Sequence, residues 1–446
     1  MLRVSGFFVA LAFACLFAAD ISITTLDPWT EMQRMGLGVV TPDFTAVSDI
    51  GWVLVRTVAF AFCGVALGAV GGFLLSQLFH YGPVRWACAF VRAIHELFWA
   101  LIFLQIFGLT PLTGVLAIAL PYAGICAKVY AETLEEGDQR AVKILAPGTD
   151  ILSAFLYARL PGVWVHIRNY TSYRFECGLR SSAVLGFVGL PTLGFYLETA
   201  FSEGNYSEAA ALMILFYIMI ASLRLWMRPK LIGLYAIVAP FFLGGGFSIE
   251  MLNIKRFFTI DIVPAPLRGE ALDSMNTWSQ FADWVWFISV DMAVPGIIAT
   301  VLLTQIALVG TGVLALLMFP LISKKFFGPV GRSIGHGFLV VVRSTPEFIL
   351  AYIFLQLWGP SMLPAIVALA LHNGAIIGHL MGRFSDEVKL RPDHARGLNL
   401  YGFEMLPRIY GQFLAYLFYR WEVIMRETAI LGILGIATLG FFSDTA

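Results

Sequence analysis

The chain has 446 residues, of which 59% are hydrophobic and 13% are charged, and its formal net charge is zero. Soluble domains carry roughly 25% charged residues and about 45–50% apolar residues. This composition, with a mean hydropathy of +0.80, excludes a soluble globular protein and predicts an all-α polytopic membrane protein. The balanced charge gives no indication of nucleic-acid binding.

The first apolar run, residues 4–19, follows Arg3 and lacks a small-residue cleavage site. We therefore interpret it as an uncleaved first span rather than a signal peptide. A polar, net-acidic stretch, residues 20–49, follows it. Because a helix needs about 20 residues to cross the hydrocarbon core, the next predicted spans are residues 51–79, 86–107, 112–130, 161–173 and 209–227.

The same plan then recurs. The predicted spans of the second copy are residues 231–247, 293–319, 334–358, 362–381 and 409–419, which makes eleven in all. Two complete copies of about six helices each would give twelve, so the last helix of the second copy is missing. We expect the chain to be truncated at its C-terminus, and we place the two domains at residues 1–230 and 231–446.

Charged residues recur at matched places in the two copies. Glu96 and Gln105 match Glu347 and Gln356, since 347 − 96 and 356 − 105 both give 251. The stretch 173–180 recurs as 419–426 at an offset of 246, so the second copy has lost five residues in between. Loop Lys and Arg residues favour a cytoplasmic N-terminus. Both copies then insert with the same polarity, as a parallel repeat.

Two pairs of charges stand at the edge of apolar runs at i, i+4 spacing: Arg92 with Glu96, and Arg343 with Glu347. This spacing predicts that each pair meets on one helix face. A charge at mid-membrane costs about 2.5–3.5 kcal/mol on insertion scales, and pairing lowers that cost. Each pair is either a structural ion pair that fixes helix packing or an element of a gate or ion path.

Two further sets of charges are related by the repeat. Their members are Arg174, Glu176 and Arg180 in the first copy, and Arg420, Glu422 and Arg426 in the second. Each Glu and the Arg four residues later could simply stabilise a helix. Alternatively, the arginines form an anion-attracting ring near an outer mouth, held by the two glutamates. The glycines that follow allow tight turns or close helix approach: Gly186, Gly189, Gly432 and Gly435.

Two hydrophilic loops, residues 132–160 and 383–408, end in Leu-Pro, which suits the opening of a following helix. Each is either a solvated connector or the docking place of a partner. No GxxxxGK[ST] phosphate loop is present, so the chain does not hydrolyse ATP by that route. The seven histidines show no HExxH spacing. We expect no enzyme activity, no cofactor and no metal. The five cysteines lack CxxC spacing and are expected to be small buried residues: Cys15, Cys63, Cys88, Cys126 and Cys177.

The stretch RAIHELFWALIF at 92–103 and the stretches YRFECGLRSSAVLGFVG at 173–189 and YRWEVIMRETAILGILG at 419–435 closely resemble the permease subunit of phosphonate ABC importers. The resemblance covers nearly all of both copies. It implies two fused, MetI-like permease units around a path for phosphonate or a related phosphorus oxyanion such as phosphate or phosphite. It also implies a cytoplasmic ABC ATPase dimer, a periplasmic substrate-binding protein and a bacterial inner membrane.

The resemblance further implies that both loops contain ATPase-coupling helices. The coupling residues that we expect are Gly148, Leu160, Pro161, Gly397, Gly402, Leu406 and Pro407. The chain departs from the family in three ways. Two units are fused, the loops lack a Glu-Ala-Ala core, and the loop region of the second copy is five residues shorter. Three alternatives stay open: a different small solute, a secondary transporter with parallel repeats, and a membrane scaffold.

Overall fold

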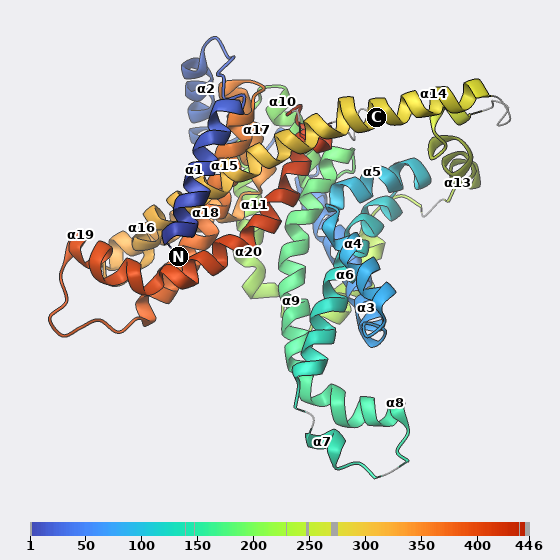
Figure 1. Cartoon of the computed structure of the whole chain (residues 1–446), viewed down its shortest axis with the longest axis horizontal. Coiled ribbons are helices and arrows are strands. Elements are labelled where there is room, and N and C mark those ends of the chain that lie inside the picture. Colours follow the sequence, from blue (N-terminus) through green and yellow to red (C-terminus); the bar gives the residue numbers. More distant parts are fainter. Residues whose placement is uncertain are drawn as a thin grey trace. The chain divides into compact units, whose positions relative to one another are not determined.

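A computed structural model describes residues 2–138, 140–146, 148–228, 230–246, 249–268, 275–436 and 438–441. Every secondary-structure element in these residues is a helix (Figure 1), which confirms the predicted all-α class. The predicted truncation concerns the end of the chain, and residues 442–446 lie outside the described residues.

Contacts divide the chain into two compact units, residues 37–264 and residues 1–36 with 265–446. These units differ from the sequence copies, because each copy's first helix packs within the unit built by the other copy. Helix α1 (Leu2–Ala18) packs against α15 (Val294–Met318). Helix α12 (Ile232–Val238) and the following turn η3 (Ala239–Phe242) pack against α3 (Ile50–Gln77).

In the unit of residues 37–264, α3 packs closely along α6 (Pro111–Glu136). Glycines one turn apart on α3 permit this approach. A Cβ at Gly68 would lie 2.8 Å from the Ala119 carbonyl oxygen. The other long helices here are α4 (Gly82–Ala93), α5 (Glu96–Phe107), α9 (Leu160–Val184), α10 (Leu193–Ser202) and α11 (Tyr206–Trp226). Short elements are α13 (Met251–Arg256) and η4 (Phe257–Asp261).

In the unit of residues 1–36 and 265–446, α15 packs along α18 (Met362–Glu387), and here the glycines come from α18. A Cβ at Gly374 would lie 2.8 Å from the Leu314 Cβ. The remaining helices are α16 (Pro329–Ser344), α17 (Glu347–Trp358) and α20 (Leu406–Ile433), with α14 (Met275–Trp286), η5 (Ala265–Leu267), η6 (Phe287–Ala293) and η7 (Phe319–Ile322). Helix α2 (Pro28–Val40) crosses the boundary between the two units.

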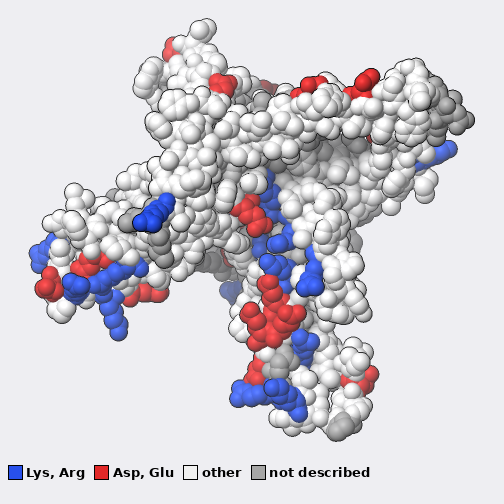
Figure 2. Space-filling model, viewed as in Figure 1, with Lys and Arg blue, Asp and Glu red and all other residues white. Residues whose placement is uncertain are grey.

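The described helices make this a multi-pass membrane protein. Five of them are long and apolar enough to cross a bilayer, or up to eight if each bent pair counts as one span. Three of the eleven predicted spans fall outside this number. Two coincide with the shorter apolar helices Arg3–Ala18 and Ile232–Phe242, and the third coincides with the charged helix α20. Figure 2 shows wide uncharged surfaces, with most of the visible charges, basic and acidic together, near the ends that carry α7 with α8 and α19.

Candidate functional site

Each unit contains a sharply broken helix. Helices α4 and α5 meet at 94°, and α16 and α17 meet at 91°. In the first copy Ile94 and His95 are extended, and the His95 side chain accepts a hydrogen bond of 3.2 Å from the Leu97 N–H. In the second copy Pro346 takes the same place. Proline lacks an N–H and keeps the preceding residue extended, so it ends α16 and starts α17.

These breaks overturn one prediction. Arg92 lies in the last turn of α4, whereas Glu96 is the first residue of α5. Arg343 and Glu347 are separated by the other break in the same way. The i, i+4 argument therefore does not apply, because neither pair lies on one continuous helix. In the sequence, Pro346 indicates the break in the second copy, whereas the residue type of His95 does not indicate the break in the first.

In the first copy the break is tied to two other helices. The Ser181 hydroxyl on α9 donates to Glu96 Oε1 at 2.7 Å, and its oxygen lies 3.2 Å from the Tyr122 hydroxyl on α6. His95 Nε2 lies 3.5 Å from Glu96 Oε2. The first residue of α5 is thus the centre of a polar cluster that joins α5, α6 and α9.

In the second copy the matching positions carry a more acidic cluster. Ligand atoms of Glu347, His372 and Glu427 lie within 4.8 Å of one another. His372 Nε2 is 3.7 Å from Glu347 Oε2, and the Asn373 amide donates to Glu427 Oε2 at 2.9 Å. One imidazole and two carboxylates are ligands that can coordinate a divalent cation.

The sequence interpretation did not include the residues that complete these two clusters, which are Tyr122, Ser181, His372, Asn373 and Glu427. A signal was present. At the offsets already noted, Asn373 matches Tyr122 and Glu427 matches Ser181, so each copy places polar groups at the same two points inside helices. Polar residues inside the membrane raise the free energy of insertion, and they usually have a function.

The predicted arginine sets lie on single helices, as their spacing requires. Arg174 on α9 is held by tyrosines: its Nε donates to the Tyr170 hydroxyl at 2.8 Å, and its guanidinium lies 4.8 Å from the Tyr170 ring and 5.5 Å from the Tyr173 ring. Arg180 is half-buried on the same helix, while Glu176 is exposed. The second set repeats this pattern on α20: Arg420 and Arg426 are half-buried, and Glu422 is exposed. Neither glutamate takes part in an ion pair recorded for the described residues.

The glycines after each arginine set lie in a tight turn and at a close approach of two backbone segments, the two features that the sequence predicted. Gly189 and Gly435 adopt positive φ values of 88° and 82°. A Cβ at Gly186 would lie 2.0 Å from the Phe195 nitrogen, and a Cβ at Gly432 would lie 2.1 Å from the Phe441 nitrogen. Nearby, the Leu193 N–H donates to Thr57 at 2.8 Å, and the Leu439 N–H donates to Thr300 at 3.0 Å. Both copies therefore build the same turn.

The two hydrophilic loops are partly helical. The first contains α7 (Arg140–Lys143), α8 (Ile151–Ala154) and the π-helical turn η1 (Phe155–Arg159). The second contains α19 (Gly397–Asn399) and the π-helical turn η8 (Leu400–Met405). In both, the π turn runs directly into Leu-Pro at the start of α9 or α20. Because proline has no N–H and its ring crowds the preceding turn, a widened turn is expected there.

The expected coupling residues lie on or beside these turns. Gly148 and Gly397 have positive φ values of 91° and 62°. Gly402 lies inside η8 in open space. The loops are also tied back to the membrane helices. Arg159 donates to the Leu134 carbonyl at 3.0 Å. In the other unit, Lys325 lies in the connection between η7 and α16 and donates to the Ser385 carbonyl near the end of α18 at 2.6 Å, and burial lowers the pKa of Lys325.

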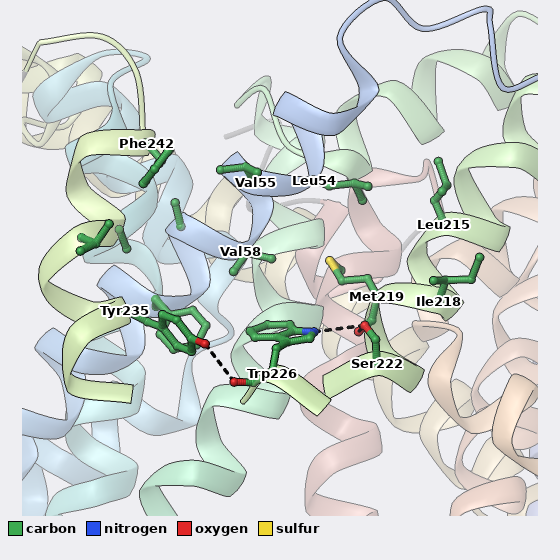
Figure 3. A pocket seen from close by; sticks show the side chains of 14 residues that line it. Leu54, Val55, Val58, Leu215, Ile218, Met219, Ser222, Trp226, Tyr235 and Phe242 are labelled. Atoms are coloured by element: carbon green, nitrogen blue, oxygen red, sulfur yellow. Dashed lines mark hydrogen bonds between the residues drawn. The ribbon is translucent and has the colours of Figure 1, made fainter. Parts of the chain in front are cut away.

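An apolar cavity of about 480 Å³ lies between α3, α11 and α12 (Figure 3). The polar groups that line the cavity already form hydrogen bonds within the protein. The Trp226 indole N–H donates to Ser222 at 3.1 Å, and the Tyr235 hydroxyl donates to the Trp226 carbonyl at 3.0 Å. The cavity therefore offers apolar surface and no charged group, so it does not suit an oxyanion.

No known family profile and no solved structure matches the chain. Curated transport permeases do match it. The chain is 26% identical over 445 residues, 92% of this chain and 81% of the relative, to a phosphate-import permease PhnE of Mycolicibacterium smegmatis. It is 27% identical over 231 residues, 49% of this chain and 83% of the relative, to the phosphite permease PtxC of Stutzerimonas stutzeri.

The third comparison decides the family. The chain is 32% identical over 110 residues to the putative cryptic phosphonate permease PhnE2 of Escherichia coli and covers 90% of it, while the match spans 24% of this chain. The chain belongs to the PhnE-like transport permeases. The PhnE-like match to the Mycolicibacterium relative runs through both copies, whereas PtxC corresponds in extent to about half of the chain. This PhnE-like permease is therefore a transport subunit of the membrane.

Proposed function

We propose that this chain is the fused permease of an ABC importer for phosphonate or a neighbouring phosphorus oxyanion, phosphate or phosphite. The observation that carries the proposal is the alignment of 92% of the chain with a phosphate-import permease. Relatives named for phosphite and phosphonate transport support the same class of cargo.

The proposed assembly has two MetI-like units of about six helices, inserted in parallel in a bacterial inner membrane with the N-terminus in the cytoplasm. Broken helices with bends of 94° and 91°, and helices α6 and α18 of equal length (26 residues each), support the idea of two like units. The fused chain would take the place of a permease dimer. A cytoplasmic ATPase dimer would drive it, and a periplasmic binding protein would deliver substrate.

The loops 132–160 and 383–408 are the proposed ATPase contacts. Each carries a short helix, a π turn and Leu-Pro before a long helix that contains one arginine set. Movement of a docked loop would pass along α9 or α20, since a continuous helix transmits displacement over its length. The arginine sets would then shift as the ATPases close.

Arg174, Arg180, Arg420 and Arg426 are the proposed anion-attracting ring. A ring of like charges raises the local concentration of counter-ions and favours anions over cations. The half-buried position of all four side chains supports this role. Glu96 and Glu347, at the two helix breaks, are proposed elements of a gate, because both start the second segment of a broken helix.

A bacterial strain without its own phosphonate and phosphate uptake tests the proposal. The chain would be expressed with a cognate ATPase and binding protein, and uptake of labelled methylphosphonate, phosphate and phosphite would be compared with that of sulfate. We expect uptake of at least one phosphorus oxyanion and co-purification of the ATPase. Sulfate uptake alone would keep the permease role and reject the cargo.

One observation favours a second candidate, a proton-coupled secondary transporter. In the cluster of Glu347, His372 and Glu427 the last two residues are buried and Glu347 is half-buried, and all three are titratable, as in proton relays of transporters. Uptake by such a protein would collapse with a protonophore and would need no ATPase.

A further inference from the structure

Four basic side chains gather between α16 and α18, apart from the arginine sets described above. They are His336, Arg343, His379 and Arg383. The rings of His336 and His379 lie 5.2 Å apart between centroids. The charges of Arg343 and Arg383 also act on His379. Like charges brought together repel each other, and the repulsion grows where the surroundings exclude water.

His379 forms the buried floor of this basic cluster. It is only 2% exposed, and its Nδ1 has no hydrogen-bond partner among the described residues. His336 and Arg383 are exposed, and Arg343 is half-buried. The cluster thus combines a buried polar atom with a rim of basic side chains that a dissolved ion can reach. A buried polar atom without a partner costs free energy, so a ligand that binds it restores a missing interaction.

We propose that His336, Arg343, His379 and Arg383 bind a phosphorus oxyanion. The proposal rests on the proposed function and names a binding place on the path of the cargo. A phosphorus oxyanion carries several acceptor oxygens and up to two negative charges, which suit imidazole and guanidinium donors. The phosphate of a lipid headgroup has the same chemistry, so it is the other source of such a ligand.

The first copy supplies an internal comparison. At the offset of 251, His336, Arg343 and His379 match Arg85, Arg92 and Lys128. All three positions stay basic although two of the three residue types change. Imidazole, guanidinium and ammonium groups differ in shape, but each offers N–H donors to an acceptor. This pattern indicates that the three positions share a role in binding a hydrogen-bond acceptor.

The two copies differ at the fourth position of the cluster. Arg383 matches Glu132, and Glu132 pairs with Lys128 at 3.7 Å. The acidic side chain neutralises part of the positive charge in the first copy. In the cluster between α16 and α18 the matching position carries a guanidinium instead, so an anion meets a cation there and not a carboxylate.

Phosphorus NMR line broadening of methylphosphonate tests the site, because it detects weak binding. The full chain is placed in nanodiscs of phosphatidylcholine alone. We expect the double variant His336→Gln with Arg383→Gln to lose binding about tenfold, since two charge-assisted contacts are removed. Both side chains are exposed, so folding is preserved. Lys389→Gln removes one exposed cation outside the cluster and leaves binding unchanged. Equal broadening by wild type and the double variant would overturn the proposal.

Two further arms separate the possible causes. Adding phosphatidylglycerol to the nanodiscs shows the source of the ligand. If this lipid abolishes the broadening that the wild type shows in phosphatidylcholine alone, the site is supported and the lipid headgroup occupies it. Uptake by the complete importer is measured in parallel. Wild-type uptake without binding at the cluster would reject the site and keep the proposed function, whereas absence of phosphorus-oxyanion uptake would reject the function.

Discussion

The Ser181 hydroxyl donates a 2.7 Å hydrogen bond to Glu96 Oε1, which joins the last turn of α9 to the first residue of α5. The arginine set and the helix break of the first copy are thereby coupled through one contact. Helix α9 also begins at the predicted ATPase loop. This hydrogen bond places the carboxylate of the proposed gate on the helix that would carry the movement of the loop.

Replacing Ser181 by Ala should destabilise the unit by about 1–2 kcal/mol, because a carboxylate with little exposure loses a donor. Thermal unfolding in detergent measures the loss. Ser172→Ala on the same helix is the control, since the Ser172 hydroxyl donates to the Arg168 carbonyl one turn away in the same helix. Equal melting temperatures of the two variants would show that the contact with Glu96 contributes nothing.

Gly186→Ala and Gly432→Ala should each prevent folding of the turn that follows the arginine set. The new methyl group would lie 2.0 Å or 2.1 Å from a backbone nitrogen, and backbone cannot move aside as a flexible side chain does. Gly162→Ala is a matched control, because a Cβ there meets nothing within 4 Å. Size-exclusion profiles of the purified variants provide the measurement. Monodisperse Gly186→Ala protein with wild-type stability would contradict the described turn.

Phe8→Ala should destabilise the unit that contains the second copy, although Phe8 belongs to the first. Its ring lies 5.3 Å from Phe418 and 5.4 Å from Trp421 between centroids. We expect a loss of about 1–2 kcal/mol, because two edge-to-face contacts and their packing disappear. Phe17→Ala is the control, since that ring is 80% exposed. Limited proteolysis of α20 reports the effect, and unchanged protection would argue against the exchange of first helices.

The double variant Arg180→Ala with Arg426→Ala should abolish uptake and leave assembly with the ATPase intact. Its physical reason is the loss of one cation from each arginine set, which lowers the attraction for an anion. Uptake of labelled substrate and co-purification of the ATPase are measured together. Arg168→Ala, an exposed change on α9, is the control. Wild-type uptake by the double variant would remove the ring from the account.

The sequence predicted the helical class, the matched charges and the glycine turns, because duplication makes such features visible twice. It failed at the helix breaks. Helical spacing joined Arg92 to Glu96, but His95 caps a new helix there, and a capping histidine has no distinctive pattern. The sequence also did not predict that α1 and α12 each pack in the unit of the other copy, because apolar periodicity does not specify which apolar surface a helix contacts.

The buried clusters show a different limit. The sequence shows Glu427 as a charge in a helix, but its approach to Glu347 and His372 depends on how α17, α18 and α20 pack together. Spacing rules describe neighbours along one helix and give no information about such contacts. The π turns before Leu160 and Leu406 were likewise unpredicted, although the prolines that follow them provide a physical reason.

ATP dependence of transport shows whether this permease works as part of an ABC importer. The chain would be reconstituted in proteoliposomes with its ATPase and binding protein, and labelled methylphosphonate, phosphate and phosphite would be followed with a protonophore present. We expect uptake of at least one of the three that requires ATP and the binding protein and persists with the protonophore. Uptake without ATP that stops when the proton gradient collapses would contradict this expectation.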